Sequence, residues 1–310
     1  MRVFVTGATG VVGRRAVPLL IRAGHQVTAV ARSPEKRDAL ARAGATAIAL
    51  DLFAPEAVRA AVAGHDAVIN LATHLPAGLR IFLPGAWREN DRIRREGSAI
   101  LVDAALAGGV GRLIQESFAP VYPDCGDAWI DESVPIATVG YNRTVADAER
   151  SAERFSAAGR VGVVLRFALF YGTDSSYTRD LIGYVRRGFV PIPAAAGAYI
   201  SSVSHDDAAT AVVAALAARA GTYNVVDNEP MRRRDFFGAL AGALGVPPPR
   251  LAPPWMKYLF GSLGEMFARS LRISNRKLGE ECGWAPNYPT MRESWRALVE
   301  ALGESRRHAA

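Results

Sequence analysis

Cysteine, clustered histidine and long apolar runs are what this 310-residue chain most lacks. Its two cysteines, Cys125 and Cys282, are too few for a disulfide framework, and its five histidines are scattered without metal-ligand spacing. No apolar run approaches the ~20 residues that a membrane span needs. The chain opens on a strand pattern and not on a basic and then apolar leader. We therefore expect a cytoplasmic protein with no membrane span and no bound metal.

Lysine is also nearly absent. The lysines are Lys36, Lys257 and Lys277, so arginine carries almost all of the net charge of +7. This excess is either an ordinary solvated surface or an attraction for a phosphorylated cofactor and an acidic substrate. Because no basic run is interleaved with aromatic residues, the sequence does not indicate a nucleic-acid partner.

The first thirteen residues carry the strongest signal that is present. A short apolar strand at 3–5 runs into glycines at positions 7, 10 and 13, and a helix pattern follows at once. Gly7 allows a sharp turn, Gly10 allows close approach of the backbone to a pyrophosphate, and Gly13 allows the helix to pack tightly on the strand. The free N–H groups at the start of that helix favour an anion. The alternative is a tight turn that binds nothing.

Strand and helix patterns alternate up to about residue 168 at the spacing of βαβ units. The expected strands are 2–6, 26–31, 45–50, 66–71, 111–116 and 161–167. The expected helices are 11–23, 34–43, 55–62, 89–108 and 142–158. The strands are near-continuous apolar runs, as in parallel sheets that helices cover on both faces. The sequence therefore predicts an α/β fold with a doubly wound parallel sheet (Rossmann).

The pattern loosens after residue 168. A strand at 199–203, a helix at 206–218 and a strand at 222–226 indicate that residues 201–226 return to the dinucleotide-binding domain of residues 1–168. Residues 169–200 and 227–310 would then form a smaller, mostly helical C-terminal lobe that binds the substrate. Apolar residues at helical spacing predict one helix over 255–271.

Further motifs follow the glycine loop in a characteristic order. They are Asp51-Leu52, Asn70-Leu-Ala72, Leu165-Arg-Phe-Ala-Leu-Phe-Tyr-Gly172, Asp206-Asp207 and Cys282-Gly-Trp-Ala-Pro-Asn-Tyr-Pro289. Together with Thr6-Gly-Ala-Thr-Gly-Val-Val-Gly13, they resemble the extended short-chain dehydrogenase/reductase superfamily, in its epimerase/dehydratase group. The resemblance covers roughly residues 1–300 and is much more specific for the fold than for the substrate.

The resemblance implies where a dinucleotide cofactor binds. The implied cofactor-binding residues are Gly7, Thr9, Gly10, Val11, Val12, Gly13, Arg32, Asp51, Leu52, Leu71, Ala72 and Thr73. In the family, the acid at Asp51 meets the adenine amino group. The carboxylate that binds the ribose hydroxyls of NAD(H) is missing, because Ala31 stands about where it belongs and Arg32 follows. A guanidinium can grip a 2′-phosphate, so we predict NADP(H) in preference to NAD(H).

The same resemblance implies catalysis by a tyrosine, a lysine four residues later and an upstream serine. Tyr141 fits the tyrosine, but Val145 stands in the lysine position. The serine position falls on Phe118, with Ser117 one residue before it. An unassisted tyrosine with a pKa near ~10 can donate a proton during reduction but is a poor base for oxidation. We therefore predict Tyr141 as the proton donor and Ser117 as its polar helper.

Glu116 is an unusual acid at the end of a core strand. It is either a general base or a carboxylate satisfied by an arginine. Lys257 or Lys277 would replace the missing lysine only if the fold brought one of them to Tyr141. Further candidates for contact with the substrate or the nicotinamide are His74, Asp124, Cys125, Asp127 and Trp129.

The leading hypothesis is an NAD(P)-dependent oxidoreductase or epimerase-like enzyme that acts on a small polar carbonyl or hydroxyl compound. Nucleotide sugars and natural-product intermediates are candidate substrates. The altered catalytic motif leaves two alternatives open. One is a non-catalytic redox sensor or scaffold that binds a dinucleotide, and the other is a non-redox enzyme with Glu116 as its base. The resemblance also implies a possible homodimer through the helices at 89–108 and 142–158.

Overall fold

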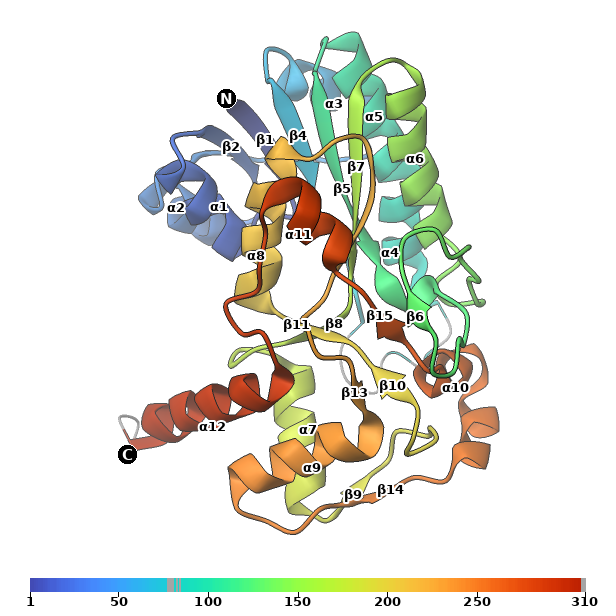
Figure 1. The fold of residues 1–310 in the computed structure, drawn as a ribbon. Coiled ribbons are helices and arrows are strands. Elements are labelled where there is room, and N and C mark those ends of the chain that lie inside the picture. Colours follow the sequence, from blue (N-terminus) through green and yellow to red (C-terminus); the bar gives the residue numbers. More distant parts are fainter. Residues whose placement is uncertain (77–80, 82, 84, 308–310) are drawn as a thin grey trace.

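Seven parallel strands form the central sheet of the protein, shown as a computed structural model in Figure 1. The structure describes residues 1–76, 81, 83 and 85–307, with side chains to residue 303. In spatial order the strands are β12 (Gly221–Val225), β7 (Val161–Phe167), β5 (Arg112–Phe118), β4 (Ala67–Asn70), β1 (Arg2–Thr6), β2 (Gln26–Val30) and β3 (Thr46–Ile48). The strand order reverses between β1 and β4. In open α/β sheets this switch point is where ligands bind, at the carboxyl ends of the strands.

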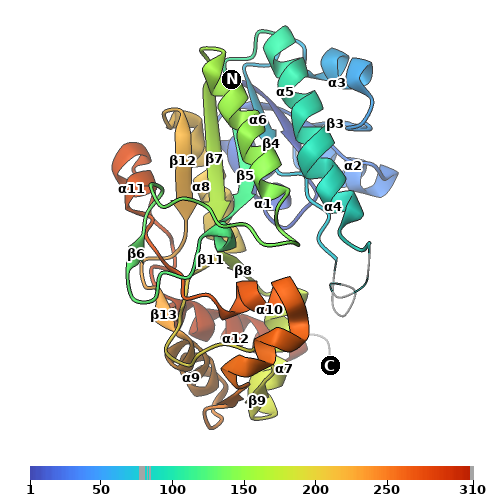
Figure 2. The ribbon, with the colours of Figure 1, turned by 90° about the vertical axis from the view of Figure 1, so that its right-hand side faces the viewer.

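Helices cover both faces of this sheet. On one face lie α1 (Gly13–Arg22), α2 (Pro34–Arg42), α8 (His205–Ala214) and α11 (Arg276–Cys282), and on the other lie α3 (Pro55–Val62), α5 (Ser98–Ala107) and α6 (Val145–Ala157). The first group buries residues such as Leu20 and Val212 against the sheet, and the second buries Leu101 and Phe155. Figure 2 shows α5 and α6 side by side. The predicted doubly wound parallel sheet is confirmed.

A second apolar core lies below the sheet in Figure 1. It is built by α7 (Ser176–Arg186), α9 (Arg233–Leu244) and α12 (Met291–Arg307) around the buried Trp295. Four two-stranded sheets accompany it: β8 (Leu169–Tyr171) with β11 (Ser202–Ser204), β10 (Tyr199–Ile200) with β13 (Met231–Arg232), β9 (Phe189–Val190) with β14 (Arg250–Leu251), and β6 (Trp129–Ile130) with β15 (Arg272–Ile273). Among the described residues, the helices all fall short of the length and apolar content that crossing a bilayer requires.

The single helix predicted over 255–271 is wrong. Residues Pro254–Phe260 form a 3₁₀ helix, and α10 (Gly261–Ala268) follows it. The break falls at Gly261, whose φ of +53° lies outside the right-handed helical region. Trp255 and Tyr258 in the 3₁₀ segment are 60% and 77% exposed, so their helical spacing does not mark a buried face.

Two other predicted helices have different internal geometry. The helix expected over 142–158 begins at Val145, which leaves Tyr141 in the turn before it. The helix expected over 89–108 consists of α4 (Arg88–Arg92), a π-helical turn (Ile93–Gly97) and α5. A π turn inserts an extra residue into the helical register and is frequently found at functional sites.

Asp227 places a buried carboxyl group directly after β12. Ser202 Oγ donates a hydrogen bond to its Oδ2 at 2.8 Å, and the Glu229 amide donates to its Oδ1 at 3.2 Å. Burial raises the pKa of this carboxyl to about 8, so the group is largely neutral in the folded protein at pH 7.

Asp227→Asn is expected to flatten the pH dependence of stability. Because the folded pKa of about 8 lies above the unfolded value of ~3.9, the neutral carboxyl contributes stability that is complete below about pH 4 and is lost as the pH rises through 8. Between pH 5 and pH 7, the free energy of unfolding of the wild type should fall relative to that of the variant by up to ~1.4 kcal/mol per pH unit. Chemical denaturation measures this, with the exposed Asp38→Asn as control. Equal slopes for wild type and Asp227→Asn would contradict a neutral Asp227.

Candidate active site

The glycine loop between β1 and α1 has the backbone geometry of a phosphate cradle. Gly7 has a φ of +66°, and a Cβ atom added there would lie 2.2 Å from the Leu71 carbonyl oxygen. A Cβ atom at Gly13 would lie 2.2 Å from the Gly7 carbonyl oxygen. Both contacts are shorter than real Cβ atoms allow, so these two positions require glycine. A Cβ atom at Gly10 would lie 3.2 Å from the same oxygen, which is a tight contact. Because Gly10 has no side chain, the backbone at the top of the loop can approach a ligand closely.

The start of α1 fits an anionic group. No side chain caps this helix, and its first turn holds no acidic residue. The Arg14 and Arg15 amides donate to the carbonyl oxygens of Gly10 and Val12, so an anion would be bound by the amides of the turn before them. The side chains of Arg14 and Arg15 both form ion pairs with Asp174, and Arg15 also forms one with Asp206. These contacts turn both arginines toward the loop after β8 and the start of α8.

A buried polar network supports the segment that the resemblance places beside the cofactor. Thr6 Oγ1 donates to Asn70 Oδ1 at 2.6 Å, and Asn70 Nδ2 donates to Gln115 Oε1 at 2.9 Å. The Ala72 amide donates to Asn70 Oδ1 at 3.3 Å. The network ties the carboxyl ends of β1, β4 and β5 together and so holds Leu71, Ala72 and the following Thr73 at the switch point of the sheet.

The end of β2 combines a small residue with an exposed arginine. Ala31 is buried, whereas the Arg32 side chain is 79% exposed and its Nη1 lies 3.9 Å from Glu89 Oε1. At the next strand, Asp51 Oδ1 accepts a hydrogen bond from the Phe53 amide, which fixes the turn at Asp51 and Leu52. Thr9 and Val11 lie at the surface of the glycine loop, and Val12 beneath it is buried. The residues present therefore fit a dinucleotide.

Tyr141 belongs to a small apolar cluster beside α10. Its hydroxyl donates to Met266 Sδ of α10, and its ring meets the Trp87 ring edge-on with 4.7 Å between centroids. Val139, Leu263 and Phe118 belong to the same apolar cluster. Burial raises the pKa of Tyr141 well above its ordinary value, against the opposing charges of Arg94 and Arg269.

The Ser117 hydroxyl is bonded to a partner other than Tyr141 in this structure, and its role as polar helper stays a prediction. Side chains alternate along β5, and the Ser117 hydroxyl points toward α6, where it donates to Glu149 Oε1 at 2.5 Å. Glu149 also forms a buried ion pair with Arg166 at 2.7 Å. Phe118, the next residue, packs in the cluster around Tyr141. Ser117 therefore belongs to a buried structural network.

Glu116 is paired with an arginine that the sequence analysis overlooked. Arg94 Nη2, from the π-helical turn, lies 3.4 Å from Glu116 Oε1, and both side chains are almost fully buried. Burial raises the pKa of Glu116, although the Arg94 charge opposes that shift. Among the described residues, Glu116 Oε2, Arg94 Nε and Asn90 Nδ2 have no hydrogen-bond partner. Buried unpaired polar atoms of this kind are costly and point to a functional cause.

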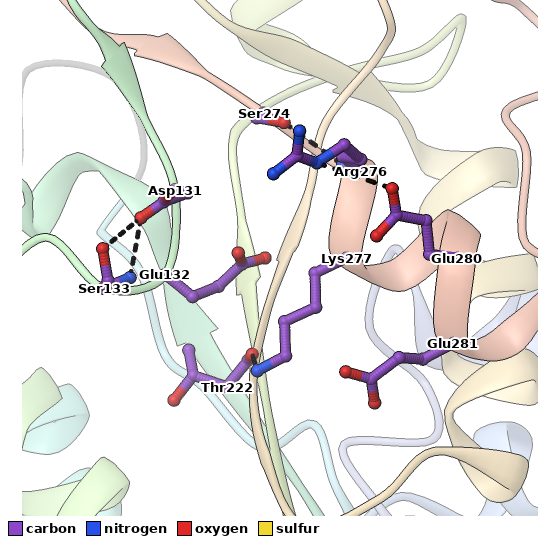
Figure 3. A pocket seen from close by; sticks show the side chains of 9 residues that line it. All are labelled: Asp131, Glu132, Ser133, Thr222, Ser274, Arg276, Lys277, Glu280 and Glu281. Atoms are coloured by element: carbon purple, nitrogen blue, oxygen red, sulfur yellow. Dashed lines mark hydrogen bonds and ion pairs between the residues drawn. The ribbon is translucent and has the colours of Figure 1, made fainter.

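The two lysines that might have replaced the missing one make their contacts with residues other than Tyr141 in the described structure. Lys277 Nζ donates to the Thr222 carbonyl oxygen at 2.9 Å, in a pocket of about 490 Å³ that Glu132 and Glu281 also line (Figure 3). This pocket lies beside the edge strand β12 and includes none of the predicted site residues. Lys257 Nζ lies 5.2 Å from the ring centroid of its exposed neighbour Tyr258.

The loop of residues 122–132 connects the central sheet to the part of the chain around the second apolar core. Its Trp129 and Ile130 pair with β15, and Asp127 pairs with Arg232 at 2.9 Å. The Cys125 amide donates to the Ser270 carbonyl oxygen, and Asp124 Oδ1 accepts from the Gly126 amide. This loop therefore packs against residues 232 and 270–273. A substrate role stays a prediction for Asp124, Cys125, Asp127 and Trp129.

His74, the other candidate for contact with the nicotinamide, follows β4. Its amide donates to Asn90 Oδ1 at 3.0 Å.

Comparison with known proteins agrees with this geometry. A family model described as NAD(P)H-binding matches residues 7–162. The chain is 33% identical to the 3-diazoavenalumate denitrifying reductase of a Streptomyces species, over 94% of this chain and 98% of that protein. It is 26% identical to the 2-alkyl-3-oxoalkanoate reductase of Shewanella oneidensis, over 88% of this chain and 73% of that protein.

A solved structure extends the likeness to the whole fold. MoeE5 in complex with UDP-glucuronic acid and NAD superposes with a TM-score of 0.78 at 24% identity, covering 98% of this chain and 100% of that one. At this identity the likeness shows the fold, whereas the family model and the full-length Streptomyces relative show the family. The chain therefore belongs to the family that this NAD(P)H-binding model describes.

Proposed function

We propose that this protein is an NADP(H)-dependent reductase that acts on a small carbonyl compound bearing an acidic group. When bound, the nicotinamide supplies the hydride. Tyr141 donates the proton from its Oη to the substrate oxygen, so that a carbonyl becomes a hydroxyl. The substrate is held between the sheet and the lobe formed by residues 169–200 and 227–310.

The protonation state of Tyr141 is the observation that favours reduction over oxidation. Its pKa is raised by burial, and Val145 in place of a lysine leaves no ammonium beside it to lower the pKa. The phenol is therefore protonated at neutral pH and is a competent acid but a poor base. Reduction needs the acid, and oxidation of an alcohol needs the base.

Two arginines in the lower lobe support an acidic substrate. Arg269 is buried and its charge acts on Tyr141, and it is bound to the carbonyl oxygen of Tyr122. Arg233 is buried beside it and is bound to the carbonyl oxygens of Phe267 and Arg269. Burial lowers the pKa of Arg233 to about 10, and among the described residues its Nε lacks a partner. A substrate carboxylate would offset this buried positive charge. The names of both curated relatives contain an acid anion, avenalumate and oxoalkanoate.

Arg32→Ala tests the preference for NADP(H). The exposed guanidinium at the end of β2 is proposed to bind the 2′-phosphate, so its loss should weaken NADPH binding by roughly 10- to 100-fold, as expected for a hydrogen bond to a charged group. NADH binding should stay unchanged. Calorimetric titration of both nucleotides measures this, with the exposed Arg42→Ala on α2 as control. Equal weakening of NADH and NADPH would contradict the assignment of Arg32.

A second candidate function follows from the residues at the serine and lysine positions. Phe118 and Val145 leave the site with little of the acid–base machinery that carbonyl reduction uses. Replacing the diazo group of an arene by hydrogen needs one hydride and releases dinitrogen, so the products balance without an added proton. The Streptomyces relative is named for a diazo compound, which makes an aryl diazo acid the second substrate class to test.

A substrate panel separates these functions. The panel contains 3-oxo acids, aryl diazo acids and a nucleotide sugar, with NADPH consumption followed at 340 nm and products identified by mass spectrometry. Reduction of the 3-oxo acid to a hydroxy acid supports the main proposal, and release of dinitrogen supports the second. Tight NADPH binding without turnover would favour a sensor or scaffold, and product formation without NADPH consumption would favour a non-redox enzyme.

The possible homodimer through residues 89–108 and 142–158 stays a prediction that light scattering tests.

A further inference from the structure

The helix that runs from α4 through the π-helical turn into α5 faces Tyr141 and the start of α6. Trp87, just before α4, meets the Tyr141 ring, and Asp91 Oδ1 accepts a hydrogen bond from Thr144 Oγ1 at 2.8 Å. Arg95, in the π-helical turn, pairs with Asp147 of α6 at 3.4 Å. Arg94 thus lies in a turn that packs against the segment following Tyr141.

Arg94 is held in place as a buried cation. The residue is 3% exposed, and its Nη2 contacts Glu116 Oε1 at 3.4 Å. Its Nε has no partner among the described residues, so part of the guanidinium's hydrogen-bonding capacity is unused. Of the charges that act on Tyr141, that of Arg94 lowers its pKa most. Lys257 and Lys277 make their contacts elsewhere, as described above.

We propose that Arg94 takes over the electrostatic role of the absent lysine and stabilises the phenolate that Tyr141 becomes after it has given its proton to the substrate. The inference rests on the proposed function, because it concerns the proton donor of that reaction. In each cycle the Tyr141 O–H bond breaks, a substrate O–H bond forms, and the phenolate later recovers a proton from water. Arg94 acts through Tyr141 and is a positioning residue. Glu116 fixes the guanidinium and balances its charge.

The location of Arg94 on a π turn explains why a distant residue can take this role. An α-helix advances 100° per residue, so one inserted residue rotates every following side chain relative to those before it. The insertion at Ile93–Gly97 lets the helix present Trp87 and Asp91 to residues 141–144 while α5 still buries Leu101 against the sheet. A cation on a separate helix is positioned independently of the turn that carries Tyr141.

Four variants test this role on the 3-oxo acid that the panel finds to be turned over fastest. Arg94→Ala should lower kcat by roughly 10²-fold while KM and NADPH affinity stay within a few-fold of wild type, as expected when an electrostatic stabiliser of the transition state is removed. Arg94→Lys should restore most of the activity, and millimolar guanidinium chloride should partly rescue Arg94→Ala. The control is Arg95→Ala in the same turn, whose exposed side chain contacts Asp147.

The fourth variant, Arg94→Ala/Glu116→Gln, separates catalysis from stability. Removing both charges avoids an unpaired buried carboxylate, so its thermal midpoint should recover toward wild type while kcat stays low. Recovery of kcat in this double variant, or equal losses in Arg94→Ala and Arg95→Ala, would overturn the inference and leave the proposed function standing. Absence of wild-type turnover, or full activity of Tyr141→Phe, would overturn both.

Discussion

Tyr141→Phe is expected to lower kcat for carbonyl reduction by about 10²- to 10⁴-fold, the usual contribution of a general acid. The ring would keep its edge-on contact with Trp87 and its place in the apolar cluster, because only the hydroxyl is removed. The lost hydrogen bond to Met266 is a weak one, so the thermal midpoint should change little. Steady-state kinetics at saturating NADPH measures the loss, and calorimetry should give the same NADPH affinity as wild type.

Tyr258→Phe provides the matched control for this substitution. Tyr258 is 77% exposed on the 3₁₀ segment, so loss of its hydroxyl should leave kcat unchanged. Release of dinitrogen from an aryl diazo acid needs no proton donor and should survive Tyr141→Phe if the second candidate function is correct. Carbonyl reduction at the wild-type rate by Tyr141→Phe would remove this residue from the catalytic site.

Gly13→Ala is the second substitution with a large expected effect. Its Cβ atom would meet the Gly7 carbonyl oxygen at 2.2 Å and the Ala8 Cα at 2.7 Å, and both are backbone atoms that cannot turn aside. The loop must then move away from the start of α1, which separates the N–H groups proposed to bind the pyrophosphate. We expect NADPH affinity to fall by more than about 10²-fold, as for the loss of two charge-assisted hydrogen bonds.

Gly24→Ala controls for the general cost of replacing glycine. Gly24 has a φ of +83°, but an added Cβ atom there would contact nothing within 4 Å. This variant should lose about 1 kcal/mol of stability and bind NADPH normally. Calorimetric titration on both folded variants makes the comparison. Normal NADPH binding by Gly13→Ala would contradict the proposed phosphate cradle.

The sheet was predictable because its strands are short buried runs that can be located from their local apolar composition. Residues 67–69 are apolar and all of β4 is buried, and burial on both faces favours that pattern. The glycine loop was predictable because the spacing of its glycines is itself a local signal, although the backbone that crowds Gly7 belongs to the distant Leu71. The two-part segment 254–268 was not, because Gly261 interrupts an apolar spacing that reads as one continuous helix.

The candidate site was only partly predictable from sequence. Tyr141 is a candidate because of its motif, and its catalytic role stays a prediction. The side of β5 on which Ser117 lies depends on the register of the strand and on the distant Glu149. Arg94 was missed because its pairing with Glu116 spans 22 residues and depends on a π turn that the spacing of apolar residues does not reveal. One of the two interpretations of Glu116, as a carboxylate satisfied by an arginine, did predict that its partner is an arginine.

Deuterium transfer from NADPH labelled at C4 of the nicotinamide tests the central claim most directly. Incubation of the labelled nucleotide with the purified protein and a 3-oxo acid should give a hydroxy acid that carries one deuterium at the former carbonyl carbon. Each hydrogen on C4 is labelled in turn, and one of the two labels should be transferred. A protein that binds NADPH tightly yet yields no deuterated product from any member of the panel would contradict the assignment as a reductase.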